Sequence, residues 1–137
     1  MPHQLLVIDS RDRTGGDTND FFVNFRPGLQ DVHSIKLLYC DIHSPAGDTE
    51  PYYLISSSLG AHVRGATQGS SSTSIVPRTA AAGFRTFWAQ NSRFPAIVFE
   101  EPARSLTNLA VSVRVRGGGS ANLTEDWFMI LEVAMHA

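Results

Sequence analysis

Residues 109–133 read LAVSVRVRGGGSANLTEDWFMILEV, and this stretch decides the fold class. Apolar residues occupy every second position on both sides of a glycine-rich turn at residues 117–120. They are Leu109, Val111, Val113 and Val115 before the turn, and Trp127, Met129, Leu131 and Val133 after it. A period of two is typical of strands with one buried and one solvated face. Because the connection is too short for a crossover helix, the stretch predicts two strands paired as an antiparallel β-hairpin.

Shorter runs of the same kind predict strands over the rest of the chain. The expected strands are residues 5–8, 21–25, 34–42, 52–58, 84–89 and 96–99, with turn formers such as Pro27-Gly28 between them. Residues 34–42 carry apolar side chains on both faces, which is typical of a central strand. No window of twelve or more residues keeps a helical spacing between two caps. We therefore expect an all-β fold with little helix, an antiparallel two-sheet sandwich of about eight strands that is jelly-roll-like.

The composition indicates one module without a nucleic-acid surface. A chain of 137 residues is expected to form a single β-sandwich domain, residues 1–137, with a loop rich in Gly, Ser, Thr and Ala at residues 65–83. That segment has few large side chains to bury, so we expect it to be mobile or ordered by a partner. The 11 Lys and Arg residues are scattered and the net charge is −2, which argues against nucleic acid as a partner.

The sequence also predicts a protein made in a cytosol. Its first residues lack the basic and apolar regions of a signal peptide, and no apolar run approaches the roughly 20 residues that span a bilayer. The sole cysteine, Cys40, cannot form an intrachain disulfide, and we expect it to be a small apolar residue in a strand. No membrane partner is therefore expected.

No pattern in the chain matches an enzyme. The histidines lack metal-ligand spacing, the serines lack the Gly-x-Ser-x-Gly elbow, and there is no Gly-x-x-x-x-Gly-Lys phosphate loop. Glu100 and Glu101 are adjacent and face opposite sides of a strand, which is poor geometry for an acid and base pair. We therefore predict that the protein is not an enzyme and has no catalytic residues, cofactor or small-molecule substrate.

An acidic cluster near the N-terminus has two interpretations. It consists of Asp9, Asp12, Asp17 and Asp20. Carboxylates crowded in one loop could bind Ca²⁺, although their spacing does not match the EF-hand. Alternatively, Arg11 and Arg13 neutralise the carboxylates while the Asp side chains accept hydrogen bonds from turn N–H groups. We favour the second interpretation and predict no metal site.

Four aromatic residues offer a different kind of site. Tyr52, Tyr53, Trp88 and Trp127 could form a platform on which sugars stack, although such residues are typical of the core in a sandwich of this size. A carbohydrate-binding module is therefore an alternative function.

The order of residues along the chain resembles a family of virion proteins. The residues that carry the resemblance are Ile8-Asp9-Ser10-Arg11-Asp12-Arg13, Asn19-Asp20-Phe21, Val23, Val32, Ile35, Leu37, Asp41-Ile42 and Tyr52-Tyr53, followed near the end by Leu106-Thr107-Asn108-Leu109, Val111, Val113, Gly118, Trp127 and Leu131-Glu132-Val133. They are similar to a pattern in small β-sandwich virion structural proteins, the capsid cement, decoration or minor capsid proteins of double-stranded DNA viruses and phages. The chain departs from it at His43-Ser44, where a Pro-Asn pair is expected.

The resemblance implies a capsid cement or decoration protein on the virion surface, made in the host cytoplasm. It implies binding to the major capsid protein, and we expect symmetric assembly as a homotrimer. The expected contact elements are the loops Asp9–Asp20 and Gly65–Gly83. The candidate contact residues are Arg11, Asp12, Arg13, Phe22, Ile75, Val76 and Arg78. A tail, baseplate or fibre-associated adaptor is an alternative with the same architecture.

Overall fold

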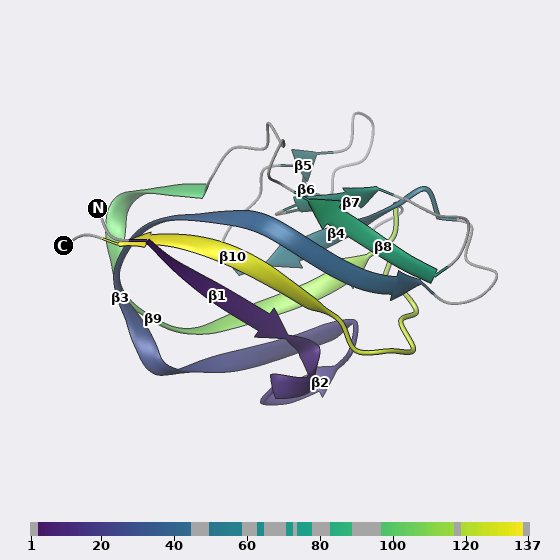
Figure 1. The fold of residues 1–137 in the computed structure, drawn as a ribbon, viewed down its shortest axis with the longest axis horizontal. Helices are drawn as coiled ribbons and strands as arrows, with labels where there is room; N and C mark the ends of the chain where they lie inside the picture. The colour runs from purple at the N-terminus through teal and green to yellow at the C-terminus, as the bar shows by residue number, and fades with distance from the viewer. Residues whose placement is uncertain are drawn as a thin grey trace.

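The described part of the chain is built almost entirely of strands (Figure 1). The computed structural model describes residues 3–44, 50–58, 63–64, 71–72, 74–77, 83–88, 97–116 and 119–135; for residues 63–64, 71–72, 83–88 and 97–104 it describes the backbone only. The strands are β1 (His3–Asp9), β2 (Gly15–Asp17), β3 (Asp20–Ser44), β4 (Tyr52–Ser57), β5 (Val63–Arg64), β6 (Ser71–Ser72), β7 (Ser74–Pro77), β8 (Gly83–Trp88), β9 (Ile97–Arg114) and β10 (Phe128–Met135). A single 3₁₀ turn, η1 (Ser10–Asp12), is the one helical element in these ranges. None of the described residues belongs to a helix long and apolar enough to cross a membrane.

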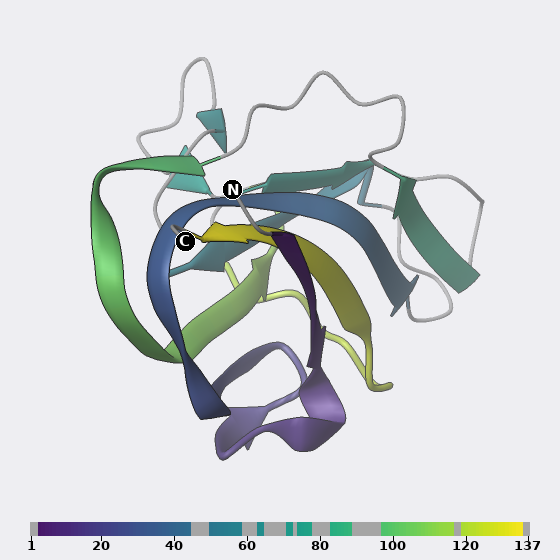
Figure 2. The same ribbon diagram turned by 60° about the vertical axis from the view of Figure 1, so that its left-hand side comes forward.

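Most of these strands belong to one antiparallel sheet that curls into a half-barrel (Figures 1 and 2). The hydrogen-bonded order is β1-β10-β3-β9-β4-β7, with β2 and β8 also paired to β3, while β5 and β6 form a separate ribbon. The prediction of an all-β antiparallel fold is confirmed. Apart from the β5-β6 ribbon, the described strands form one continuous curled ladder, where the sequence predicted two sheets.

β3 organises the sheet because it pairs with four other strands along its 25 residues. The sequence predicted two strands here, separated at Pro27-Gly28, and that separation is wrong. The chain bends and remains extended: its register with β9 skips from Asn24 to Leu29, and Asp31 has a φ of 51°. The Arg26-Pro27 peptide bond is cis. A strand can bend in this way and keep its neighbours when residues are left out of the ladder. Residues 34–42 lie inside the sheet, as predicted for a central strand.

β9 and β10 do not form the predicted hairpin, because β3 lies between them in the sheet. The alternation itself is confirmed, since Leu109, Val111, Val113, Met129, Leu131 and Val133 are all buried. The chain does turn back after β9, where the Val115 N–H donates to the Gly119 carbonyl at 2.8 Å. It then continues to β10 on the other side of β3. A period of two identifies the buried face of a strand and leaves its partner undetermined.

The segment at residues 65–83, predicted as a loop, contains strands. β6, β7 and the first residue of β8 lie within it. Val76 in β7 is fully buried and pairs with Tyr53 of β4, because Ile75-Val76 is a small apolar island that can join a sheet edge. The loop prediction is therefore wrong for residues 71–72 and 74–77. Residues 65–70, 73 and 78–82 lie outside the described residues.

The core fills the inside of the curl. Its largest fully buried side chains are Tyr53, Phe21, Ile8, Ile42, Ile55 and Leu109. The rings of Phe21 and Trp127 meet edge to face with centroids 5.8 Å apart. Cys40 has no exposed surface, which confirms the expectation of an apolar strand residue, and burial raises the pKa of its thiol well above the ordinary value. The thiol is therefore protonated and unreactive in the folded chain.

Candidate functional site

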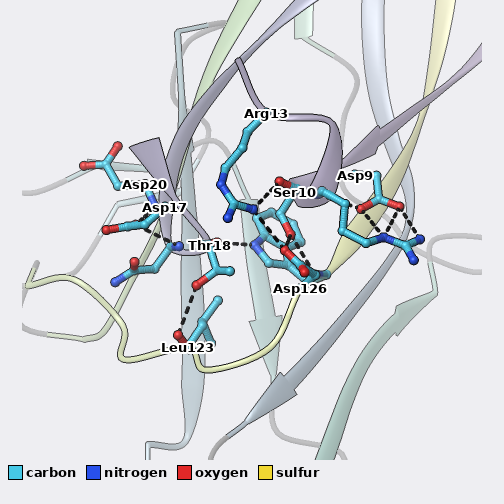
Figure 3. A network of polar contacts seen from close by, with 11 residues as sticks. Asp9, Ser10, Arg13, Asp17, Thr18, Asp20, Leu123 and Asp126 are labelled. Carbon is cyan, nitrogen blue, oxygen red and sulfur yellow. Dashed lines mark hydrogen bonds and ion pairs between the residues drawn. The ribbon is translucent and has the colours of Figure 1, made fainter. Parts of the chain in front are cut away.

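The Ile8–Arg13 motif lies where β1 ends and the chain enters η1, beside the segment that leads into β10 (Figure 3). Ser10 is fully buried there. Its Oγ donates to Asp126 Oδ1 at 2.8 Å and accepts from the Trp127 N–H at 3.0 Å, while its own N–H donates to the Trp127 carbonyl at 2.9 Å. Arg13 Nη1 donates to the Ser10 carbonyl at 2.7 Å and to Asp126 Oδ1 at 3.1 Å. We call Ser10, Arg13, Asp126 and Trp127 the joint, because their hydrogen bonds link the residues after β1 to the segment that leads into β10.

The turn between β2 and β3 is fastened to the same segment (Figure 3). The Trp127 indole N–H donates to the Thr18 carbonyl at 2.7 Å, and Thr18 Oγ1 donates to the Leu123 carbonyl at 3.0 Å. Asn19 Nδ2 donates to the Ala121 carbonyl. Asp17 Oδ1 accepts from the Asp20 N–H at 3.0 Å and so closes the turn. Polar contacts around the buried Trp127 indole therefore hold the β2–β3 turn against residues 121–127.

Asp9 and Arg11 form an ion pair on the outer side of the motif. Arg11 Nη2 lies 2.7 Å from Asp9 Oδ2, Arg11 Nε lies 3.1 Å from Asp9 Oδ1, and that oxygen also accepts from the Arg11 N–H. These hydrogen bonds from Arg11 lower the pKa of the Asp9 carboxyl, against the weaker opposing effect of burial. The Arg11 side chain is 70% exposed, so the pair presents a guanidinium to solvent.

The acidic residues do not gather into a cation site. Asp9 is paired with Arg11, and Asp17 accepts backbone N–H groups. Within the described ranges no three His, Cys, Asp or Glu side chains lie close enough together to hold a metal ion. As the second interpretation predicted, Arg11 pairs with Asp9, and Asp17 accepts hydrogen bonds from turn N–H groups. Arg13 differs from that prediction, because it pairs with Asp126 and not with one of the clustered carboxylates.

The predicted contact residues fall into separate places. Arg11, Asp12 and Phe22 are exposed near η1 and β2, where Thr14 N–H donates to the Phe22 carbonyl at 2.8 Å. Arg13 lies in the joint and is occupied by internal contacts. Ile75 is half-buried and Val76 is fully buried in β7, at the opposite end of the strand order from β1. Val76 therefore has no surface available to a partner, because its side chain belongs to the core. Arg78 lies outside the described residues.

A groove between β1 and the first half of β3 is a hollow that the sequence did not reveal. It has a volume of about 610 Å³, within the range of about 300 to 1,000 Å³ that is usual for binding sites. We call it the seam. Its lining residues are Gln4, Leu6, Val7, Ile8, Asp12, Val23, Asn24, Phe25, Arg26, Pro27, Gly28, Leu29, Gln30 and Met135. No sequence signal identifies it, because it arises from the bend of β3. The sequence also contains no signal for Asp126, because it lies in the connection before β10 and belongs to no motif.

Two of the four aromatic residues of the sugar-platform alternative are unavailable for stacking. Tyr53 and Trp127 are buried, with 1% and 3% of their surface exposed. Tyr52 is half-buried, and the side chain of Trp88 lies outside the described residues. This arrangement weakens the carbohydrate-binding alternative. No protein-family model matches the chain, and no curated protein is similar to it in sequence.

Proposed function

We propose that the chain is a virion structural protein, a capsid cement or decoration protein that binds and stabilises the shell of the major capsid protein. One observation supports the proposal: Ile8–Arg13 and Trp127, which belong to the two stretches that carry the resemblance to such proteins, meet in the joint. Residues that lie about 115 positions apart form one hydrogen-bonded unit, Ser10 with Asp126 and Trp127. Residues from both resembling stretches thus contact each other in the fold. Arg11 and Asp12, which are exposed beside the joint, are the proposed contacts with the major capsid protein.

We also infer that the half-barrel is a jelly-roll-like sandwich, in which β3 and β9 each contribute to two sheets. The pairing supports this inference, because the first part of β3 lies between β2 and β9 while its last part lies between β10 and β8. An experimental structure with two facing sheets supports it. An open sheet without a second facing layer contradicts it.

Labelling of intact virions tests the location. Gold-labelled antibody against the chain should cover the whole shell if the protein is a cement. Label confined to one vertex would favour the tail, baseplate or fibre-associated adaptor, and absence of label from particles would contradict both. The solution mass of the purified chain tests the proposed homotrimer, which a monomer would contradict.

Add-back to particles that lack the protein tests the proposed contacts. Arg11→Glu with Phe22→Ser should reduce particle binding, whereas Asn122→Ser, an exposed change outside the assigned contact residues, should not. A point change at Ile75 is preferable to a deletion in that region, because a deletion would remove β7 together with the buried Val76. Equal binding by all variants would contradict the assigned contacts.

A further inference from the structure

We propose that the seam is a strand-addition site that accepts one extended segment of another polypeptide. The segment would lie between β1 and the first half of β3 and would hydrogen-bond to the free edge of β1. This inference does not depend on the proposed virion function, because it follows from the edges, lining and charges of the seam.

The first wall of the seam is the free edge of β1. In the described sheet β1 pairs with β10 alone and ends the strand order. The Ser10 N–H bonds to the Trp127 carbonyl, directly after the Asp9 and Phe128 pair of the ladder. Because bonded residues alternate along an antiparallel strand, the even-numbered residues of β1 face β10 and the odd-numbered residues do not. The N–H and C=O groups of Leu5 and Val7 therefore point away from β10, at the free edge of β1.

The second wall is an edge of β3 that changes partners. One edge of β3 bonds to β2 as far as Phe22 and to β10 from Val32 onward. Between these two positions, residues 23–31 have no strand on that edge within the described ranges, and most of them line the groove of about 610 Å³. β1 and this part of β3 approach each other near β2 and separate toward the other end of β1 (Figures 1 and 2). The unpaired backbone groups of β1 suit an extended chain, which the bent segment of β3 would flank on its other side.

The exposed large apolar side chains of the described residues lie on the two strands that border the seam. The large hydrophobic residues that the structure describes as exposed are Leu5 at 62%, Val7 at 57% and Phe22 at 44%. Val7 lines the seam and Leu5 lies on the same strand, whereas Phe22 lies on β3 where β2 ends, next to the lining residue Val23. Exposed apolar side chains gathered on one surface mark interaction sites. An added strand would cover part of this surface with alternate side chains of its own.

The strands that border the seam favour a single strand over a second folded copy as its occupant. If β1 of a second copy paired with the free edge of β1, its own β10 would lie on the side of the seam that β3 borders. We therefore propose an occupant with both edges free, such as an extended arm or tail. A strand that pairs along all seven residues of β1 is about 23 Å long.

The charges at the rim define the chemistry of that strand further. Asp12 lies at the η1 end of the seam and Arg26 lies farther along the β3 wall, and both are exposed. Neither forms an ion pair with another described residue. A complementary occupant carries a basic residue at the η1 end, an acidic residue nearer its middle, and apolar residues at alternate positions.

Binding of a designed peptide to the full chain tests the proposal. The probe is the capped peptide Lys-Val-Thr-Val-Glu-Val-Thr, tested beside its reversed sequence and a version with Lys and Glu exchanged. We expect one of the first two peptides to bind, and the charge-exchanged version to bind more weakly. By NMR hydrogen exchange, binding should slow the amides of Leu5 and Val7 and leave the already bonded amide of Leu6 unchanged. Absence of binding, or no protection of the odd-numbered amides, overturns the proposal.

A proline substitution separates backbone pairing from side-chain contact. Leu5→Pro removes an N–H at the free edge of β1, which an edge strand tolerates, and should weaken peptide binding about tenfold. Leu5→Thr keeps the N–H and is the matched control. If both variants bind as the unchanged protein does, the backbone edge is not used and the proposal fails.

A second variant keeps the test independent of β1 folding. Asn24→Trp places a large side chain at an exposed position of the seam and should abolish peptide binding, whereas Asn122→Trp, exposed and outside the seam, should not. Undiminished binding by Asn24→Trp overturns the proposal. So does self-association of the purified chain through β1, because the occupant would then be a second copy.

Discussion

The joint and the seam both involve β1 and its continuation, yet they use polar groups in opposite ways. In the joint, Ser10 is buried and its hydroxyl and N–H groups all have partners on Asp126 and Trp127. Beside the seam, the odd-numbered backbone groups of β1 point away from β10, and Leu5 and Val7 are largely exposed. The half-barrel is thus closed by side chains at one end of β1 and open along its edge. The hydrogen-bonded joint thus lies beside the seam, which we propose as the binding surface for an added strand.

The largest effect should come from removing the indole at the centre of the joint. Trp127→Ala deletes a side chain that is 3% exposed, together with its contact with Phe21 and its hydrogen bond to Thr18. We expect a loss of about 3 to 5 kcal/mol in the free energy of unfolding, measured by urea denaturation. Trp127→Phe keeps a ring and should lose less. A loss below about 1 kcal/mol for Trp127→Ala would show that the joint does not anchor the fold.

A smaller loss should follow from Ser10→Ala. This change leaves the buried Trp127 N–H without its side-chain acceptor and Asp126 without one of its donors, which costs about 1 to 3 kcal/mol. Ser105→Ala, at an exposed position of β9, is the control and should change stability little. A double-mutant cycle with Asp126→Ala should give a coupling of at least about 0.5 kcal/mol. Additive effects would mean that the two side chains act independently.

The same contrast explains how much the sequence could predict. Alternation along residues 109–133 correctly identified the buried faces of β9 and β10, because burial of one face is a local property of a strand. Their pairing was predicted wrongly, since β3 inserts between them and no local pattern encodes which strand becomes the neighbour. Pro27-Gly28 was interpreted as a strand end for a similar reason. Turn-forming residues also occur where a long strand bends.

The candidate site was predictable only in part. The acidic and basic residues of the Ile8–Arg13 motif stood out by their density, and the pairing of Asp9 with Arg11 followed from their proximity. Asp126 is more than 110 residues away from its partners Ser10 and Arg13, so only the fold brings them together. The seam depends on the bend in β3 and on the termination of β2 and β10, which are tertiary features. Val76 was assigned to a surface loop because its apolar island is short, although it pairs with a core strand.

A weak, pH-dependent effect is expected from the ion pair on the outer side of the motif. The pKa of Asp9 is lowered in the folded chain, chiefly by the hydrogen bonds from Arg11, so the carboxylate stabilises the fold above its unfolded pKa of about 3.9. That contribution is lost as the pH falls through the lower, folded-state pKa. Arg11→Met should therefore be slightly less stable than the unchanged chain near neutral pH, and the difference should vanish in acid. Thermal unfolding at several pH values measures it, with Arg116→Met, exposed and distant in sequence, as the control. A difference that persists in strong acid would mean that Arg11 acts by packing and not by charge.

The smallest effect should be found on the outer face of β1. Leu5→Thr combined with Val7→Thr keeps the β-propensity of the strand and removes apolar groups that are mostly in contact with solvent, so stability should change by less than about 0.5 kcal/mol. Ile8→Thr, at a position 1% exposed on the opposite face of the same strand, should cost at least about 1 kcal/mol, because it places a hydroxyl in the core. Chemical denaturation of the two variants compares the faces directly. If the double variant were as destabilised as Ile8→Thr, Leu5 and Val7 would be covered in the free protein, and the seam would already be occupied.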